Sequence, residues 1–362
     1  MRELGVATVA LLCAVALHAA DSNARTVAGA AVAPAARLAY VTETMDFAAT
    51  VWTAQASGAA RRVLGPGDDP KISPDGSLVA ASLFGGSGIF PERGPALALY
   101  PTGGGVARTY LSLASAIVSP LAWSEDSRYV AVFVGSISEH DEAGLSSLDV
   151  LDTRTGALAT IAHGQIYGAS FAPDPSDRIV YSQSPSESLA ATANLYVSGP
   201  DGSAVKRLTP NGRNLFPVWG PRYIAYDREH SRRHATRVRQ IWLLSPGGGR
   251  VERLTHMRVP AQDLGLMPIG FSQDGRRLLA EFGGEDTREP WTVGVPSGRA
   301  RRLRVRAPQA FAEGISSDGQ TLLIDEVSVG QHASSGRVVR IPFAGGPAKV
   351  LIAHGAQSSW DG

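Results

Sequence analysis

The residues best suited to chemistry lie in two long polar stretches. Residues 227–238 contain a run of arginines and histidines, and residues 136–142 are acidic. Guanidinium groups hold carboxylates and phosphates with paired hydrogen bonds, so such a run suits an anionic ligand or a protein partner. Charge runs also keep ordinary loops soluble, and this simpler interpretation stays open. The candidate ligand-binding residues are Arg228, His230, Arg232, Arg233, Glu139 and Asp141.

Three histidines recur in similar surroundings and form a candidate metal site. His163 and His354 are both the third residue of an Ile-Ala-His-Gly phrase, and His256 follows Leu254-Thr255. Each begins a connection to the next repeat of the chain, and imidazoles that converge there can hold a metal ion. Descent of the repeats from one ancestor explains the same similarity without a metal. We expect no other cofactor.

Enzyme signatures are otherwise missing from the sequence. It contains no Gly-x-Ser-x-Gly motif, and Ser317-Asp318-Gly319 lacks the residue that a sialidase Asp-box places between Asp and Gly, so we interpret it as a turn. The only cysteine, Cys13, lies in the N-terminal leader, which leaves the rest of the chain without a thiol nucleophile. These absences favour a binding module over an enzyme.

A repeated phrase defines the elements that must position these residues. Ile72-Ser-Pro-Asp-Gly76 returns in related form at 123–127, 171–175, 271–275 and 315–319, each time followed by a β-like run. Asp-Gly supplies the positive φ of a tight hairpin turn, so each copy predicts strand, turn and strand. The interval between the third and fourth copies is twice the others, and residues 217–221 fill it with a copy that has lost its Asp-Gly.

Each period also holds a second hairpin, for example through Asp201-Gly202 or Gly247-Gly248-Gly249, which gives four strands per period. Four-stranded units of about 40 to 50 residues are typical of propeller blades. The chain ends on Ser359-Trp360-Asp361-Gly362, half of the phrase, and the matching strand begins near Ala36. We therefore predict an all-β, seven-bladed β-propeller over residues 36–362, closed by pairing of the N- and C-terminal segments.

The phrase, together with Arg-Leu-Thr at 207–209 and 253–255, resembles the WD40-like (TolB-type) β-propeller repeat. The resemblance covers nearly all of the chain after residue 36. It implies a propeller, and it is compatible with protein-binding modules, sugar-cleaving enzymes and the gating domains of serine peptidases. Some relatives are oligosaccharide lyases with a His-ligated metal at the channel mouth, which is the role the resemblance implies for the three histidines. We see no segment matching the N-terminal α/β domain of TolB, so its particular role is not implied.

Strand alternation assigns the connections to two faces of the predicted disc. Both hairpin turns of a blade lie on one face, the turn face. The connections between second and third strands, and between blades, lie on the other, the loop face. Four long insertions fall on the loop face, at residues 84–93, 136–142, 182–192 and 227–238. Long loops on a rigid scaffold are common binding elements, so we place ligand binding there.

Residues 1–24 have the form of a secretory signal peptide, and residues 25–35 form an alanine-rich flexible lead-in. A retained N-terminal anchor is the alternative. The net charge of +1 argues against nucleic acid as a partner. We expect a monomer in the periplasm or outside the cell, with no membrane span after signal removal, that binds a protein or an anionic or carbohydrate ligand on the loop face. The alternative is a polysaccharide-active lyase or hydrolase with its site at the channel mouth.

Overall fold

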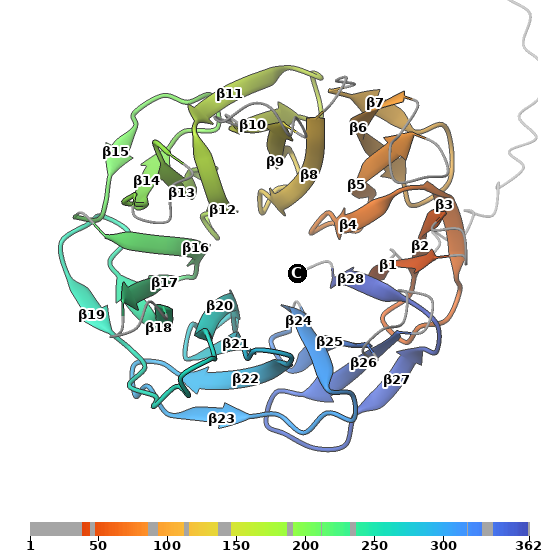
Figure 1. Ribbon diagram of the computed structural model, residues 1–362. Helices are drawn as coiled ribbons and strands as arrows, with labels where there is room; N and C mark the ends of the chain where they lie inside the picture. The colour runs from red at the N-terminus through yellow and green to blue at the C-terminus, as the bar shows by residue number, and fades with distance from the viewer. Residues whose placement is uncertain are drawn as a thin grey trace, which may run out of the picture. The chain divides into compact units, whose positions relative to one another are not determined.

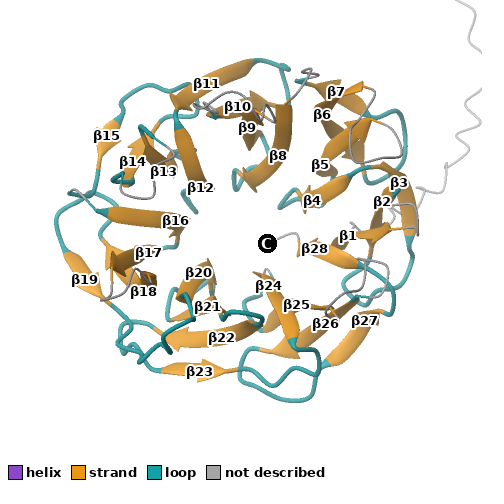
Figure 2. Cartoon of the chain, viewed as in Figure 1, coloured by secondary structure: helices purple, strands orange, loops and turns teal. Residues whose placement is uncertain are grey.

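The repeats form a ring of antiparallel four-stranded blades, and the chain is all-β over the described part of the computed structural model (Figures 1 and 2). The structure describes residues 38–43, 48–85, 93–111, 116–136, 146–186, 191–210, 212–231, 237–316, 318–327 and 336–360. All of these belong to one unit, Pro34–Gly362. The predicted leader and lead-in, residues 1–35, lie outside the described residues.

The first three blades along the chain are separate four-stranded sheets. Their strands are β4 (Asp68–Ile72), β5 (Leu78–Gly85), β6 (Arg93–Pro101) and β7 (Arg108–Tyr110); β8 (Ala116–Trp123), β9 (Tyr129–Ser136), β10 (Ser147–Asp152) and β11 (Leu158–His163); and β12 (Gln165–Phe171), β13 (Ile179–Ser184), β14 (Asn194–Ser198) and β15 (Lys206–Arg207).

The next three blades are connected into one twelve-stranded sheet. Because each connection is a single parallel residue pair, Arg239–Gly265 or Arg288–Gln309, we describe them as three separate four-stranded blades. Their strands are β16 (Arg213–Trp219), β17 (Ile224–Ser231), β18 (Arg237–Leu244) and β19 (Val251–Arg253); β20 (Gly265–Phe271), β21 (Arg277–Gly283), β22 (Arg288–Gly294) and β23 (Ala300–Arg302); and β24 (Gln309–Ile315), β25 (Thr321–Val327), β26 (Arg337–Pro342) and β27 (Lys349–Ile352).

The remaining blade is built from both ends of the chain, as predicted. Strand β28 (Ala356–Trp360) pairs antiparallel with β1 (Leu38–Glu43), which continues into β2 (Ala49–Ala54) and β3 (Arg62–Pro66). The innermost position of β28 is fixed by its neighbours on both sides. The Ile72 amide donates to Ser359 Oγ at 3.0 Å, and the Ser358 amide donates to Asp325 Oδ2 at 2.8 Å. Because both ends of the chain meet in this one blade, β28 covers the inner edge of β1 that would otherwise be open.

The repeated phrase is a turn device rather than a site. Ser73 Oγ donates to Asp75 Oδ1 at 2.6 Å, the Ser77 amide donates to the same oxygen at 2.9 Å, and Gly76 has φ of 69°. The same serine–aspartate hydrogen bond recurs at Ser124–Asp126, Ser272–Asp274 and Ser316–Asp318. In the last two copies it holds the pKa of the aspartate below its ordinary value. The Asp318 turn is therefore part of the scaffold, as the sequence indicated.

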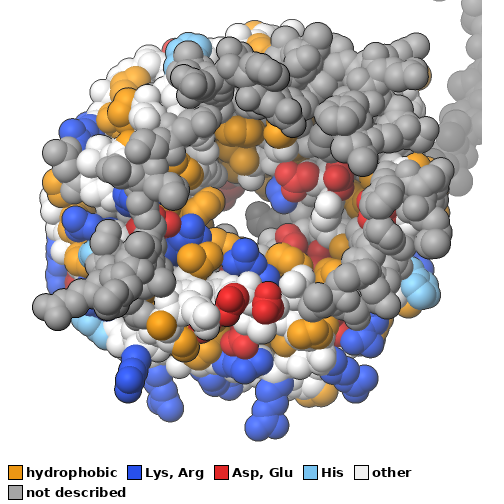
Figure 3. All heavy atoms as spheres, viewed as in Figure 1, with side chains coloured by type: hydrophobic (Ala, Val, Ile, Leu, Met, Phe, Trp, Pro, Cys, Tyr) orange, Lys and Arg blue, Asp and Glu red, His pale blue; other side chains and the backbone are white. Residues whose placement is uncertain are grey.

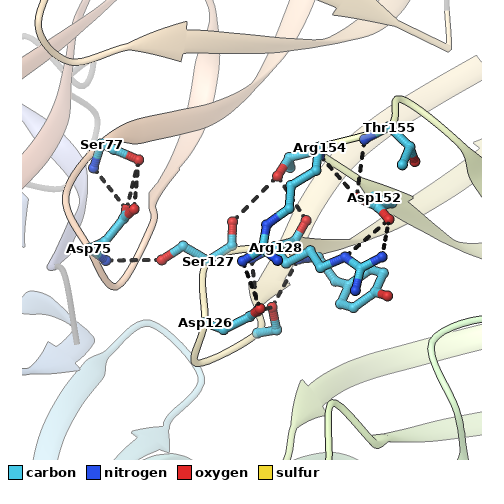
Figure 4. Close-up of polar contacts among 11 residues, drawn as sticks. Asp75, Ser77, Asp126, Ser127, Arg128, Asp152, Arg154 and Thr155 are labelled. Atoms are coloured by element: carbon cyan, nitrogen blue, oxygen red, sulfur yellow. Dashed lines mark hydrogen bonds and ion pairs between the residues drawn. The ribbon is translucent and has the colours of Figure 1, made fainter. Parts of the chain in front are cut away.

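Polar contacts also link neighbouring blades on the turn face (Figure 4). The Asp75 amide of one blade donates to Ser127 Oγ of the next at 3.0 Å. Within the β8–β11 blade, Arg128 forms an ion pair with Asp152 at 2.7 Å, and this hydrogen bond lowers the pKa of Asp152. The groups on this part of the turn face are thus used in holding turns together, which leaves the loop face and the channel as the places to look for a site.

Apolar side chains pack between successive blades. One cluster joins Ala225 and Leu243 of the β16–β19 blade to Leu278 and Val293 of the β20–β23 blade, and similar clusters occupy other blade boundaries. Five tryptophans belong to these clusters or pack against them: Trp52, Trp123, Trp219, Trp242 and Trp291.

Candidate functional site

The four predicted insertions connect second and third strands of four blades, at the places the repeat pattern indicated. Much of their length lies outside the described residues, and so do four candidate ligand residues, Arg232, Arg233, Glu139 and Asp141. Arg228 and His230 are described, and both lie on β17.

Arg228 and His230 flank the ring of Trp242. The Arg228 guanidinium carbon lies 5.2 Å from the centre of the indole, and the His230 ring centre lies 6.0 Å from it. His230 and Trp242 also line a pocket of about 470 Å³. Burial, and then the positive charges of Arg228 and Arg253, lower the pKa of His230, so this imidazole is neutral at physiological pH.

The structure does not bring the three candidate metal ligands into one group. His163, His256 and His354 are all exposed, and among the described residues no set of three His, Cys, Asp or Glu side chains is arranged to hold a metal ion. The topology explains this separation. Each histidine ends or follows the outermost strand of a different blade (β11, β19 and β27), and these strands lie around the outside of the ring (Figure 1).

The innermost strands carry a feature that the sequence analysis missed. All seven, β4, β8, β12, β16, β20, β24 and β28, show a shift in register against the second strand of their blade. Such bulges leave one or two residues out of the ladder and re-aim their side chains. The residues left out, which we call the bulge ring, are Asp69, Pro70, Leu121, Tyr167, Gly168, Phe216, Pro217, Ile269, Glu313, Gln357 and Ser358.

The strands that carry the bulge ring border the hollow centre of the molecule (Figures 1 and 3). Most of these side chains are neither fully buried nor fully exposed. Asp69, Phe216 and Gln357 have positive φ angles of 46°, 48° and 50°, which are uncommon for residues other than glycine. Local backbone strain of this kind is concentrated at functional sites in proteins, so the bulge ring is a candidate functional site.

Two blades, those that begin with β4 and β24, contribute carboxyl groups to one side of the channel, and the blade of β28 and β1–β3 lies between them. Lys71 Nζ lies 2.9 Å from Asp69 Oδ1, and Asp325 on β25 and Glu313 on β24 lie close enough for each to affect the pKa of the other. Acidic and basic side chains are visible around the hollow centre in Figure 3. We call Asp69, Lys71, Glu313 and Asp325 the carboxyl side.

The carboxyl side holds protons unusually strongly. Burial raises the pKa of Glu313 well above its ordinary value, and the charge of Asp325 adds to the effect. Burial also raises the pKa of Asp325 to about 6, although two hydrogen bonds from Ser358 oppose it. Burial alone would lower the pKa of Lys71, but Asp69 and Glu313 outweigh it and raise that pKa, so Lys71 stays charged.

The opposite part of the ring carries an arginine side, made by Arg213, Arg239, Tyr167 and Phe216. The Arg213 guanidinium carbon lies 5.6 Å from the Tyr167 ring centre, and that of Arg239 lies 5.4 Å from the Phe216 ring centre. Cations over aromatic faces are attracted by the ring electrons. Both arginines also form ion pairs with the carboxylate of Glu229, at 2.7 Å for Arg213 and 3.0 Å for Arg239.

A second carboxyl group, Asp227, lies beneath this network and is fully buried. Its Oδ2 lies 3.3 Å from Arg239 Nε. Burial raises the pKa of Asp227 to about 8, against the opposing effect of Arg239. Asp227 is therefore mainly protonated at neutral pH, which leaves two arginine charges against the one carboxylate of Glu229.

The bulge ring escaped the sequence analysis because its residues precede the turn phrase, where the repeats differ most. Glu313 and Asp69 stand five and six positions before Asp318 and Asp75. A charged residue five or six positions before the aspartate of the turn phrase is the signal that can find them.

The chain matches no family model, and a search of curated proteins finds no relative. Solved structures do match. TolB from Acinetobacter baumannii has 16% identity and a TM-score of 0.51, and the match covers 89% of this chain and 81% of that one. The propeller domain of the Trilobed protease from Pyrococcus furiosus has 13% identity and a TM-score of 0.61, with 88% and 93% covered. An oligogalacturonate lyase in complex with manganese has 13% identity and a TM-score of 0.56, with 78% and 80% covered.

These likenesses establish the fold: the chain is a β-propeller. Its architecture is TolB-like, as the repeat phrase indicated. The Pyrococcus domain is described as having an open Velcro topology, whereas β28 and β1 close the ring in this chain. Prolyl endopeptidases and an acylaminoacyl peptidase also match, at 12% and 14% identity, so the fold by itself does not decide the function.

Proposed function

We propose that the protein is an exported binding module of a bacterial envelope, whose ligand or protein partner meets the loop face at the mouth of the channel. The observation that carries the proposal is the bulge ring. Half-buried charged and aromatic side chains are costly to keep in a scaffold unless they are used. Here they occur on the innermost strands, where the fold needs no charge.

The chemistry of the ring favours a carbohydrate or an anionic group as ligand. Tyr167 and Phe216 offer ring faces, and each guanidinium of Arg213 and Arg239 has more donors than Glu229 uses. The carboxyl side can accept hydrogen bonds from hydroxyl groups. We include Arg228 and His230 of β17, together with Arg232, Arg233, Glu139 and Asp141, as the outer part of the same binding surface.

Export is part of this proposal and is supported by the leader-like form of residues 1–24. No helix in the described part of the chain is long and apolar enough to cross a membrane.

The test is capture of ligand from an envelope extract by the immobilised chain from residue 25 onward, followed by titration with the captured compound. Tyr167→Ala removes an aromatic face from the bulge ring. Tyr110→Ala removes the same side chain from an outer strand, β7, and serves as the matched control. We expect about a tenfold loss of affinity from the first and little change from the second. Equal losses, or no loss from Tyr167→Ala, would remove the channel from the binding surface.

One observation favours a second function, a polysaccharide-active lyase or hydrolase. Glu313 and Asp325 are a pair of carboxyl groups with raised pKa values, and such groups act as general acids. However, Asp325 is 1% exposed and accepts two hydrogen bonds from Ser358, so its carboxyl group is already engaged within the scaffold. The pair is better suited to holding one proton than to flanking a sugar bond, so binding is the first choice.

Turnover assays separate the two functions. Neutral and uronic oligosaccharides are incubated with the wild-type chain and with Glu313→Gln, and new reducing ends and unsaturated products are measured. Turnover that disappears in Glu313→Gln would establish the enzyme. Binding without turnover in the wild type would reject it.

A further inference from the structure

A groove on the outer rim carries a concentration of positive charge that the fold does not require. It lies between the segment that follows β22 and the turn that joins β26 to β27, and its volume is about 740 Å³. In Figure 3, Lys and Arg side chains project along the same edge of the molecule, over β23 and β27. We call this feature the rim groove. It is lined by Arg301, Arg302, Arg304, Arg306 and by the apolar residues Leu303, Val305 and Ile341, among others.

The arginines and the apolar residues of the rim groove alternate along one segment. Leu303 is 3% exposed and belongs to the core cluster of the β24–β27 blade, and Val305 packs against the same cluster. Their insertion turns the intervening Arg304 and Arg306 outward, where both are exposed. Strand β23 ends at Arg302, so Arg304 and Arg306 lie in the irregular connection that follows it. Protection of a strand edge therefore explains Arg302 but not Arg304 or Arg306.

The charge of the rim groove is mostly unbalanced. Residues 299–306 contain five arginines and no acidic residue. Among the described residues, Arg302 is the groove arginine that pairs with a carboxylate, Glu289, at 3.0 Å. Glu326 lies close to Arg306. However, its carboxylate accepts a hydrogen bond from the Arg306 backbone amide and forms an ion pair with Arg337. Arg301 is held in place by donating to the Ala344 carbonyl at 3.1 Å.

The opposite wall of the groove leaves room for a partner. It consists of Ala344, Gly345, Gly346, Pro347 and Ala348, which carry no charge and little bulk. Among the residues that the structure describes, no aromatic side chain lines the groove to offer a stacking surface for nucleic-acid bases. Its shape is a trough with apolar residues at the base and guanidinium groups along the margin.

We propose that the rim groove docks an extended, acidic segment of a partner protein, with aliphatic side chains on the groove floor and carboxylates paired to Arg304 and Arg306. Guanidinium groups bind carboxylates through two parallel hydrogen bonds, and an apolar floor adds a requirement that a plain polyanion does not meet. The surface is separate from the loop face, so the protein can hold a ligand at the channel and a partner at the rim together.

The probe is a short fluorescent peptide that alternates glutamate with valine, and its binding to the full chain is measured by fluorescence anisotropy at low and moderate salt. We expect Arg304→Glu with Arg306→Glu to weaken binding at least about tenfold. The matched control is Arg62→Glu with Lys206→Glu, which reverses two exposed charges on the outer strands β3 and β15. We expect a change of less than about twofold from it. Circular dichroism melting curves show that each variant is folded.

Further probes distinguish the proposed partner from other polyanions. A peptide that alternates glutamine with valine tests the need for charge, and one that alternates glutamate with glycine tests the need for the apolar floor. Both are expected to bind more weakly than the first peptide. Equal losses from the two variant pairs, or tighter binding of single-stranded DNA, heparin or anionic vesicles than of the glutamate–valine peptide, would overturn the proposal.

Discussion

Replacing Asp227 by Asn is expected to flatten the dependence of stability on pH. The folded chain holds the Asp227 proton up to a pKa of about 8, whereas the unfolded chain loses it near the ordinary value of 3.8. Between these values the folded state binds more protons than the unfolded state, so the free energy of unfolding falls as pH rises. Asn carries no titrating proton and removes this contribution, while Arg239 keeps its ion pair with Glu229 at 3.0 Å.

The size of the effect follows from the width of that window. A group that is protonated in the folded state and ionised in the unfolded state changes stability by about 1.4 kcal/mol per pH unit. From about pH 5 to about pH 7, the stability of Asp227→Asn relative to wild type should therefore rise by about 3 kcal/mol. Raised pKa values of Glu281, Glu313 and Asp325 also make the wild type less stable as pH rises, but they are present in both proteins and cancel in the difference.

Urea unfolding of both proteins at several pH values in this range measures the difference. Asp201→Asn is the control, because Asp201 is an exposed turn residue whose pKa is lowered by hydrogen bonds from Ser203. Its curve should run parallel to that of the wild type above about pH 5, where this carboxyl group is ionised in both states. An Asp227→Asn curve that also stays parallel to the wild type would show that Asp227 does not keep its proton in the folded chain over this pH range.

Three more predictions concern closure, export and the loop face. Deleting residues 357–362 removes four hydrogen bonds, three through the side chains of Gln357, Ser358 and Ser359 and one from the Ser358 amide, and should cost about 4 kcal/mol at roughly 1 kcal/mol per hydrogen bond. An unchanged melting temperature would contradict this. Protein from the native host should begin near Arg25 and lack Cys13, and N-terminal mass spectrometry that finds an intact Met1 or a lipidated Cys13 would reject export in this form. Reversing Arg228, Arg232 and Arg233 to Glu should weaken binding of an anionic loop-face ligand by several kcal/mol, and because Arg228→Glu also removes the contact with Trp242, melting curves check that the variant is folded. The same reversal at Arg302, Arg304 and Arg306 should leave that affinity unchanged, and equal losses measured by calorimetry would show that only diffuse charge matters.

The sequence alone determined the architecture, because the information for it is local and repeated. Gly76 and its equivalents fix tight turns, and Ser73 and Asp75 brace them within a few residues. The half phrase at Trp360 and the unmatched strand at Leu38 predicted the closure that the β28–β1 pairing confirms. Because related phrases recur along the chain, the same turn forms in successive blades. The fold could therefore be predicted without knowledge of any long-range contact.

Tertiary structure decided which residues share a place. His163, His256 and His354 are equivalent in the repeat, but rotation around the ring axis carries equivalent outer positions away from one another. Glu313 and Asp325 meet because a bulge interrupts β24, and a one-residue shift in register is not readable from an apolar strand. The rim groove arises in the same way, since Leu303 and Val305 pack inward and so turn Arg304 and Arg306 outward. Repetition specifies what the elements are, whereas bulges and packing specify which side chains meet.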